Sequence, residues 1–226
     1  MAIRRTVSVR TFREKQKNSA GKQSYHHGDL KNALLDAALN IIQRTGSCRF
    51  SLRELADSVG VTQTAVYRHF ASLDELLSTL SLAGFDKLAQ AETDSLTEVG
   101  DDPVERLRQS IATYVRFSTR NPAYFQIMFD SGVPMRAENL KRIQRSFNLL
   151  VKVVEECRAA GYLREGNPWD KAIATWAAMH GLSALVIGGQ LGEIMQKPER
   201  MARFEKEVAL MIESGLLIAK NMRPKS

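Results

Sequence analysis

The sequence has few of the residues that build disulfides, metal centres or membrane spans. Its 226 residues include two cysteines, Cys48 and Cys157, which lie far apart and form no Cys-x-x-Cys pair. We expect both to be reduced thiols that serve as small apolar residues. The sequence has no uninterrupted apolar run long enough to cross a bilayer and no secretory apolar segment. These absences predict a cytoplasmic protein without a membrane partner.

Catalytic motifs are also missing. The four histidines are His26, His27, His69 and His180; two are adjacent and the others lie far apart in the sequence. The sequence has no His-Glu-x-x-His pair, Walker loop, dinucleotide fingerprint or nucleophile elbow. Two dispersed cysteines give no ligand spacing for a metal. We therefore expect no catalytic residues, no bound metal and no cofactor.

Positive charge is concentrated at the N-terminus. Residues 1–24 hold seven Lys or Arg and one Glu, so this segment has a net charge of +6 out of +7 for the whole chain. It has little apolar periodicity, which is typical of a disordered arm. A basic arm suits contact with phosphate, although a solubilising tail has the same composition.

Apolar residues recur at helical spacing from residue 30 almost to the end, and strand signals are nearly absent. The pattern predicts an all-α protein of about nine helices. We expect four short-to-medium helices at residues 29–45, 52–59, 63–70 and 73–91, followed by helices at 103–120, 122–130, 136–160, 168–190 and 199–220.

Two of the short helices are closely joined. Ser51 followed by Glu54 is a capping-box pattern, Gly60 permits a chain reversal, and Thr62 can cap the next helix. Two short helices with a tight glycine turn, packed on a third, form a helix-turn-helix. In DNA-binding proteins of this kind, the second helix enters the major groove.

The second short helix separates into two faces. Val66 and Phe70 account for the buried side, which leaves polar side chains outward. Gln pairs with adenine edges, Thr offers a methyl and a hydroxyl, and Tyr reaches phosphate. The predicted outer residues are Gln63, Thr64, Tyr67 and Arg68. A helical corner whose polar residues merely face water is the alternative.

Three segments carry a family resemblance. YHHGDLKNALLDAALNIIQRTG, FSLRELADSVGVTQTAVYRHFAS and LDELL together resemble the DNA-binding domain of the TetR (tetracycline-repressor) family of bacterial transcription regulators, over about residues 25–80. The resemblance implies that Thr62, Gln63 and Thr64 face the groove, that Tyr67 and His69 contact phosphate, that Ser51 and Arg53 flank the groove, and that Tyr25 and His26 approach DNA. Family members often carry Lys just after the YRHF segment, where this chain has Leu73, so the resemblance does not supply that phosphate contact here.

The remainder resembles the family's helical ligand-binding and dimerisation domain. We divide the chain into the arm (1–24), a DNA-binding domain (25–75) and this domain (76–226). Trp176, His180 and Gly181 resemble the Trp-His-Gly pattern of one C-terminal subclass. The resemblance implies a small-molecule effector held between helices.

Two sets of residues are candidates for binding in this domain. Aromatic and methionine side chains can line a largely apolar ligand pocket, although an ordinary aromatic core has the same residues. These are Tyr114, Phe117, Phe125, Met128, Phe147, Trp176 and His180. Apolar stripes on the last two helices predict a homodimer interface, unless they cover their own core. These residues are Ala184, Ile187, Gly188, Phe204, Val208, Met211, Gly215 and Ile218.

The functional expectation is a homodimeric, sequence-specific DNA-binding transcriptional repressor. Its partners are double-stranded DNA with a palindromic operator, a second copy of the chain and a small effector. Two alternatives keep the fold and change its use. One is a chromosome-organising or protein-interaction module, and the other is a transcriptional activator.

Overall fold

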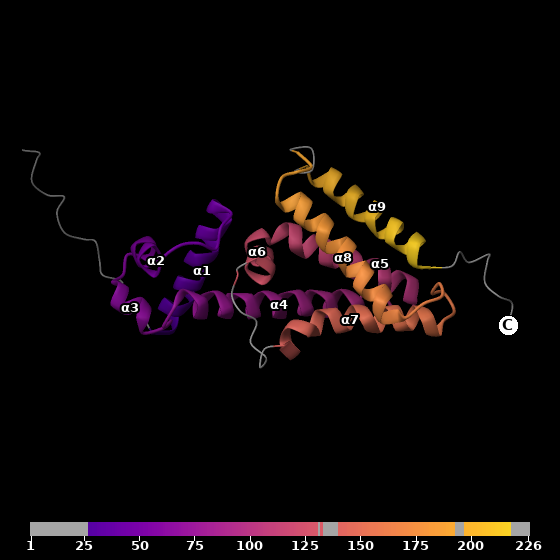
Figure 1. The fold of residues 1–226 in the computed structure, drawn as a ribbon, viewed down its shortest axis with the longest axis horizontal. Helices are drawn as coiled ribbons and strands as arrows, with labels where there is room; N and C mark the ends of the chain where they lie inside the picture. The colour runs from indigo at the N-terminus through magenta and orange to yellow at the C-terminus, as the bar shows by residue number, and fades with distance from the viewer. Residues whose placement is uncertain (1–26, 131, 133–139, 193–196, 218–226) are drawn as a thin grey trace, which may run out of the picture.

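A computed structural model of the chain describes residues 27–130, 132, 140–192 and 197–217 (Figure 1). Within these ranges the chain forms nine α-helices and no strand, apart from an isolated bridge between Leu163 and Leu217. The prediction of an all-α protein is confirmed. The helices are α1 (His27–Thr45), α2 (Leu52–Val59), α3 (Gln63–Tyr67), α4 (Leu73–Thr97), α5 (Pro103–Arg120), α6 (Pro122–Asp130), α7 (Leu140–Ala159), α8 (Pro168–Ile187) and α9 (Pro198–Leu216).

The start of α2 and the reversal after it follow from local hydrogen bonds. The Ser51 hydroxyl accepts from the Glu54 amide at 3.1 Å, and the Glu54 carboxylate accepts from the Ser51 amide at 2.7 Å. Gly60 has a φ of +75°, in the left-handed region that favours glycine. The Val61 amide donates to the Ala56 carbonyl at 3.0 Å, which closes the helix end. The predicted capping box and chain reversal are therefore confirmed.

Helix α3 is shorter than the sequence pattern predicts. It ends at Tyr67, and the His69 amide then donates to the Val66 carbonyl at 2.9 Å, which tightens the chain into a turn. This turn brings Phe70 into the core, where its side chain is 1% exposed. We call residues 27–72 the head.

Helix α4 is continuous from the head into the rest of the molecule (Figure 1). Leu76, Leu77 and Leu80 pack in the apolar cluster of the head. Phe85 and Leu88 pack in the second cluster, formed by the C-terminal helices. The boundary expected after residue 75 therefore falls at the start of a helix that both clusters share.

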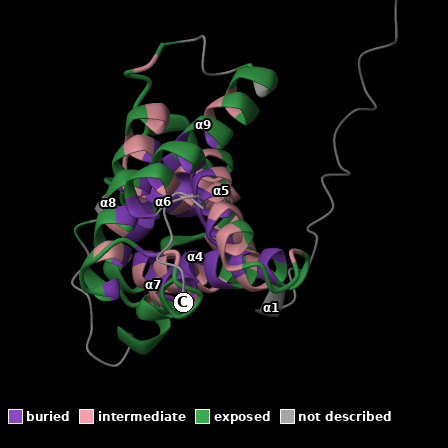
Figure 2. Cartoon of the chain, turned by 90° about the vertical axis from the view of Figure 1, so that its right-hand side faces the viewer, coloured by how far each residue is buried: buried purple, intermediate pink, exposed green. Residues whose placement is uncertain are grey.

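The body, which we define as the described residues from 103 to 217, is built around α5. Helix α5 packs against α4, α7, α8 and α9. Figure 2 shows the buried residues, in purple, where these helices face one another, with exposed residues, in green, on the outside. Arg106 pairs with Glu156 at 2.8 Å, which ties α5 to α7. No helix in the described part of the chain is long and apolar enough to cross a membrane.

Helix α6 belongs to both clusters. Ala123 and Ile127 pack in the cluster of the head, whereas Met128 packs in the cluster of the body. The Gln126 side-chain amide also donates to the Gly46 carbonyl at the end of α1. A Cβ on Gly84 of α4 would lie 2.7 Å from the Met128 sulfur, so a larger residue there would force the Met128 side chain to shift. Helix α6 is thus a direct mechanical connection between the head and the body.

Candidate DNA interface and ligand site

The first candidate site is the outer face of α3. Thr62, Gln63 and Thr64 are exposed at its N-terminal end, and Tyr67 is 51% exposed. Val66, on the opposite side, is fully buried in the head. The division of α3 into two faces therefore matches the sequence pattern, and the polar face is free to meet a DNA groove.

Two of these side chains touch each other. The Gln63 amide nitrogen lies 3.4 Å from the Tyr67 hydroxyl, one helical turn away. Arg68 is exposed at the C-terminal end of α3. His69 is half-buried just beyond it.

The residues at the start of α2 have different roles from each other. Arg53 is exposed and points away from the head's core. The Ser51 hydroxyl instead donates to the Glu54 carboxylate at 2.9 Å and accepts from the Glu54 amide. Because its hydroxyl and its backbone amide are both used in the cap, we expect Ser51 to act beside the groove by positioning α2.

Two further expectations concern the edges of this surface. Tyr25 and His26 lie outside the described residues. Leu73, which stands where family members often carry Lys, is half-buried and packs against the cluster of the head. Its position explains the departure, since this residue contributes to the core and offers no cation to phosphate.

We expect substitutions on α3 to separate base preference from phosphate binding. Gln63→Ala or Thr64→Ala should change the preferred base pairs, because a lost base contact is worth about 1–3 kcal/mol. Tyr67→Phe should weaken operator and non-operator DNA together, because a phosphate contact reads no sequence. Fluorescence anisotropy with a selected duplex and a scrambled one measures both effects. Equal losses for all three variants on every duplex would overturn this division of roles.

The second candidate site is an aromatic cluster in the body. The Trp176 indole donates to the Tyr114 hydroxyl at 3.3 Å, and that hydroxyl lies 3.1 Å from Nδ1 of His180. An indole N–H can only donate, so the Tyr114 oxygen accepts from Trp176. The Tyr114 O–H can then donate to Nδ1 of a neutral His180. Burial lowers the pKa of His180, which favours that neutral form. These two contacts use the Trp176 N–H, the Tyr114 hydroxyl and Nδ1 of His180.

Phenylalanine rings surround these polar groups. His180 stacks on Phe125 with ring centroids 4.9 Å apart and meets the edge of Phe129 at 4.7 Å. The ring centroid of Phe147 lies 5.8 Å from that of Trp176 and 5.0 Å from that of Trp169. The sequence reasoning did not include Phe129 or Trp169. The spacing of Phe129, one turn after Phe125, was the signal that could have identified it.

The two other predicted pocket residues have packing roles. Phe117 is half-buried against the main cluster of the body, and Met128 fills the space above Gly84. Both side chains therefore hold helices together in this structure. Five of the seven predicted pocket residues do form one aromatic cluster.

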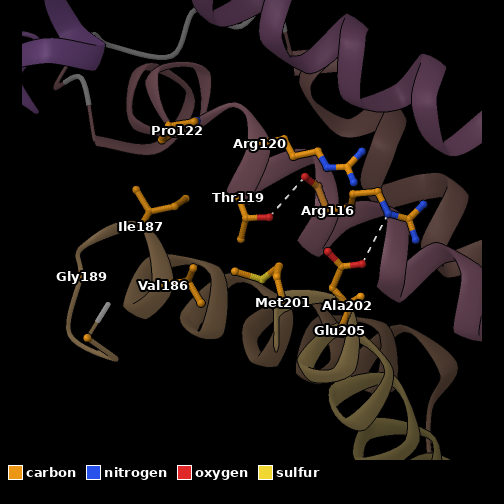
Figure 3. Close-up of a pocket in the computed structure, with 11 residues that line it drawn as sticks. Arg116, Thr119, Arg120, Pro122, Val186, Ile187, Gly189, Met201, Ala202 and Glu205 are labelled. Carbon is orange, nitrogen blue, oxygen red and sulfur yellow. Dashed lines mark hydrogen bonds and ion pairs between the residues drawn. The ribbon is translucent and has the colours of Figure 1, made fainter. Parts of the chain in front are cut away.

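A cavity lies in a different part of the body. Its volume is about 730 Å³, within the usual range for small-molecule sites. It is lined by the C-terminal part of α5, the first residue of α6, the end of α8 with its following turn, and the first turns of α9 (Figure 3). None of the seven residues predicted for the ligand pocket lines it. Its lining residues are Arg116, Thr119, Arg120, Pro122, Val186, Ile187, Gly189, Gly192, Met201, Ala202 and Glu205.

The structure describes seven of the eight predicted dimer residues, and they are exposed, buried or partly covered. Met211 is 70% exposed, and Gly188 and Gly215 are also exposed. Val208 is 4% exposed in the core of its own body, which removes it from a surface interface and corrects that assignment.

The rest of that set is partly covered within the chain. Phe204 packs on the same core, Ala184 is half-buried, and Ile187 lines the cavity. Ile218 lies outside the described residues.

The structure identifies other exposed residues on these two helices. Leu185 is 44% exposed and Leu210 is 37% exposed. Ala178 and Gly181 are exposed on α8, and a Cβ on Gly181 would meet nothing within 4 Å. Small residues beside exposed leucines allow a second helix to approach closely.

Comparison with protein families matches both parts of the chain. Residues 34–80 match the family described as bacterial regulatory proteins, tetR family. Residues 107–211 match the tetracyclin repressor-like C-terminal domain.

Relatives of known sequence and structure agree with these matches. The nucleoid occlusion factor SlmA of Enterobacter sp. (strain 638) is 29% identical over 156 residues, which cover 66% of this chain and 75% of that protein. A Rhodococcus sp. RHA1 protein of unknown function superposes with a TM-score of 0.71 at 27% identity, covering 87% of this chain and 100% of that one. The TetR-family transcriptional regulator PfmR of Thermus thermophilus superposes with a TM-score of 0.64 at 25% identity, covering 82% of this chain and 96% of that one.

A helix-turn-helix head with an exposed second helix, joined to a helical body and matched to bacterial regulatory proteins, identifies a DNA-binding transcriptional regulator. With both of its parts matched, the chain belongs to the TetR family of bacterial regulators.

Proposed function

We propose that this regulator is a homodimeric repressor that leaves a palindromic operator when a small, largely apolar ligand binds the body. The observation that carries the proposal is the position of α6, which packs in both clusters and bonds to the end of α1. A ligand that favours one arrangement of the body therefore also favours one placement of the head.

The homodimer is supported by the exposed apolar residues of α8 and α9. Met211, Leu185 and Leu210 are large apolar side chains that face solvent in the single chain. Burying them against a second copy is favourable, and two-fold symmetry matches the symmetry of a palindrome. We also propose that the body belongs to the Trp-His-Gly subclass, on the pattern of Trp176, His180 and Gly181.

Repression follows from the simplest use of this architecture. A dimer that covers a promoter blocks polymerase without any additional contact surface. An activator needs a further surface that contacts polymerase.

A chromosome-organising role is the second candidate, because relatives of this chain are nucleoid occlusion factors by name. Mapping the occupied sites across the genome separates the two. A repressor occupies one or a few promoters, and transcription of the adjacent genes rises when the protein is deleted. If the protein occupies many dispersed sites and transcription beside them is unchanged, the chromosome-organising role is favoured over repression.

A further inference from the structure

The cavity of the body has one charged wall. Arg116 and Arg120 are one turn apart on α5, so their side chains project from the same side of the helix. Figure 3 shows both guanidinium groups extending from α5, with Glu205 of α9 below Arg116. Two arginines and one glutamate leave this wall with a net positive charge among the lining residues.

The two arginines differ in how their charge is compensated. Arg116 pairs with Glu205, whose side chain is 10% exposed, at 3.4 Å. Arg120 is exposed and has no ion-pair partner within the described ranges. Thr119 lies between the two arginines. Its hydroxyl donates to the Val115 carbonyl at 2.8 Å, so that proton is not available to a ligand. Arg120 is therefore the available donor of this wall.

The opposite wall is apolar. Val186 and Ile187 come from the end of α8, and Met201 comes from the first turn of α9 (Figure 3). Pro122 completes this lining where α6 begins. A methionine adapts its shape to different hydrocarbon groups, which suits a ligand with an apolar body.

We propose that this cavity binds an amphipathic organic anion. Its carboxylate accepts hydrogen bonds from the Arg120 guanidinium, which is built for planar, two-oxygen recognition. Its hydrocarbon part lies against Val186, Ile187 and Met201. The aromatic cluster around Tyr114 is then a structural support of the body, since the Tyr114 hydroxyl is paired with Trp176 and His180.

Such a ligand touches the first residue of the connection between body and head. Pro122 lines the cavity, and Ala123, the next residue, packs in the cluster of the head. Release of DNA by this anion rests on the function proposed above, whereas binding of the anion to the cavity does not.

The test uses the full chain and decanoate as the probe, with decan-1-ol as an uncharged control of the same chain length. Calorimetric titration measures both affinities. We expect the wild-type chain to prefer decanoate by about tenfold or more, as a charge-assisted hydrogen bond contributes about 1.5–3 kcal/mol. Arg120→Met should remove this preference and leave decan-1-ol binding unchanged, and Arg120→Lys should restore part of it.

Arg158→Met is the matched control, because Arg158 is also an exposed basic residue in the last turn of its helix and does not line the cavity. It should keep the preference for decanoate. If decanoate does not bind the wild-type chain, binds no better than the alcohol, or binds Arg120→Met equally well, the proposal is overturned.

A separate DNA measurement distinguishes the two proposals. Decanoate that binds through Arg120 without releasing a selected operator supports the site and contradicts release of DNA through this cavity. Release of the operator by another ligand, with no binding of decanoate, supports the repressor and contradicts this site.

Discussion

Met211→Glu is expected to leave the chain folded, convert it to a monomer and lower its affinity for a palindromic operator. Met211 is 70% exposed in the single chain, so a charged residue is tolerated there before assembly. In the proposed dimer the same position is covered, and two-fold symmetry places two unpaired carboxylates in one interface. An uncompensated charge costs several kcal/mol, which corresponds to a loss of about a hundredfold or more in dimer stability.

Sedimentation and operator binding measure the effect together. The matched controls are Met211→Leu, which keeps an apolar side chain, and Lys206→Glu, which introduces a carboxylate at another exposed position of α9 and changes the net charge by −2 rather than −1. Both should remain dimeric and retain operator affinity. A dimeric Met211→Glu protein with wild-type affinity would place the interface elsewhere.

Glu92→Gln is expected to remove a pH dependence of stability. Glu92 of α4 is 2% exposed, and its Oε2 has no hydrogen-bond partner in the described part of the chain. Burial raises the pKa of Glu92 from 4.5 to about 8, and the Ser146 side chain on α7 only partly offsets this shift. The folded chain therefore holds a proton that the unfolded chain has released.

This difference lowers the free energy of unfolding as the pH rises between these two values. The slope from one such group is on the order of 1 kcal/mol per pH unit. Glutamine resembles the protonated carboxyl in shape and charge, but its side chain does not ionise in this pH range. We expect the variant to match the wild type near pH 5 and to be more stable by on the order of 3 kcal/mol near pH 8.

Urea unfolding at a fixed protein concentration, repeated across this pH range, provides the comparison. Glu98→Gln is the control, because Glu98 is exposed at the end of the same helix. It should keep the wild-type slope. Parallel pH profiles for wild type and Glu92→Gln would show that Glu92 is ionised in the folded chain.

Local signals in the sequence were sufficient to predict most of the helices. Prolines at 103, 122 and 168 mark helix starts that the structure also has, because proline suits the first helical position. Ser51 with Glu54 predicted the capping box, because both partners lie within one turn of the chain and the pattern is therefore local. The end of α3 was predicted too late, because the turn that inserts Phe70 depends on packing against the rest of the head.

The binding sites were less predictable, because they depend on contacts between distant helices. The face of α3 was readable, since Val66 and Phe70 identify the buried side by spacing alone. The cavity was not predicted, because Arg120, Val186 and Met201 come from three separate helices and no local pattern joins them. Likewise, helical spacing groups Val208 with Met211, but only the packing of α9 on α5 shows which of them faces solvent.

The most direct test of the central claim is to select bound sequences from a random pool of double-stranded DNA and to determine the mass of the complex on the selected site. A homodimeric regulator that reads DNA with the exposed face of α3 should select a palindromic consensus and bind it with an even number of chains. Binding without a consensus, or a single chain on an asymmetric site, would contradict the account.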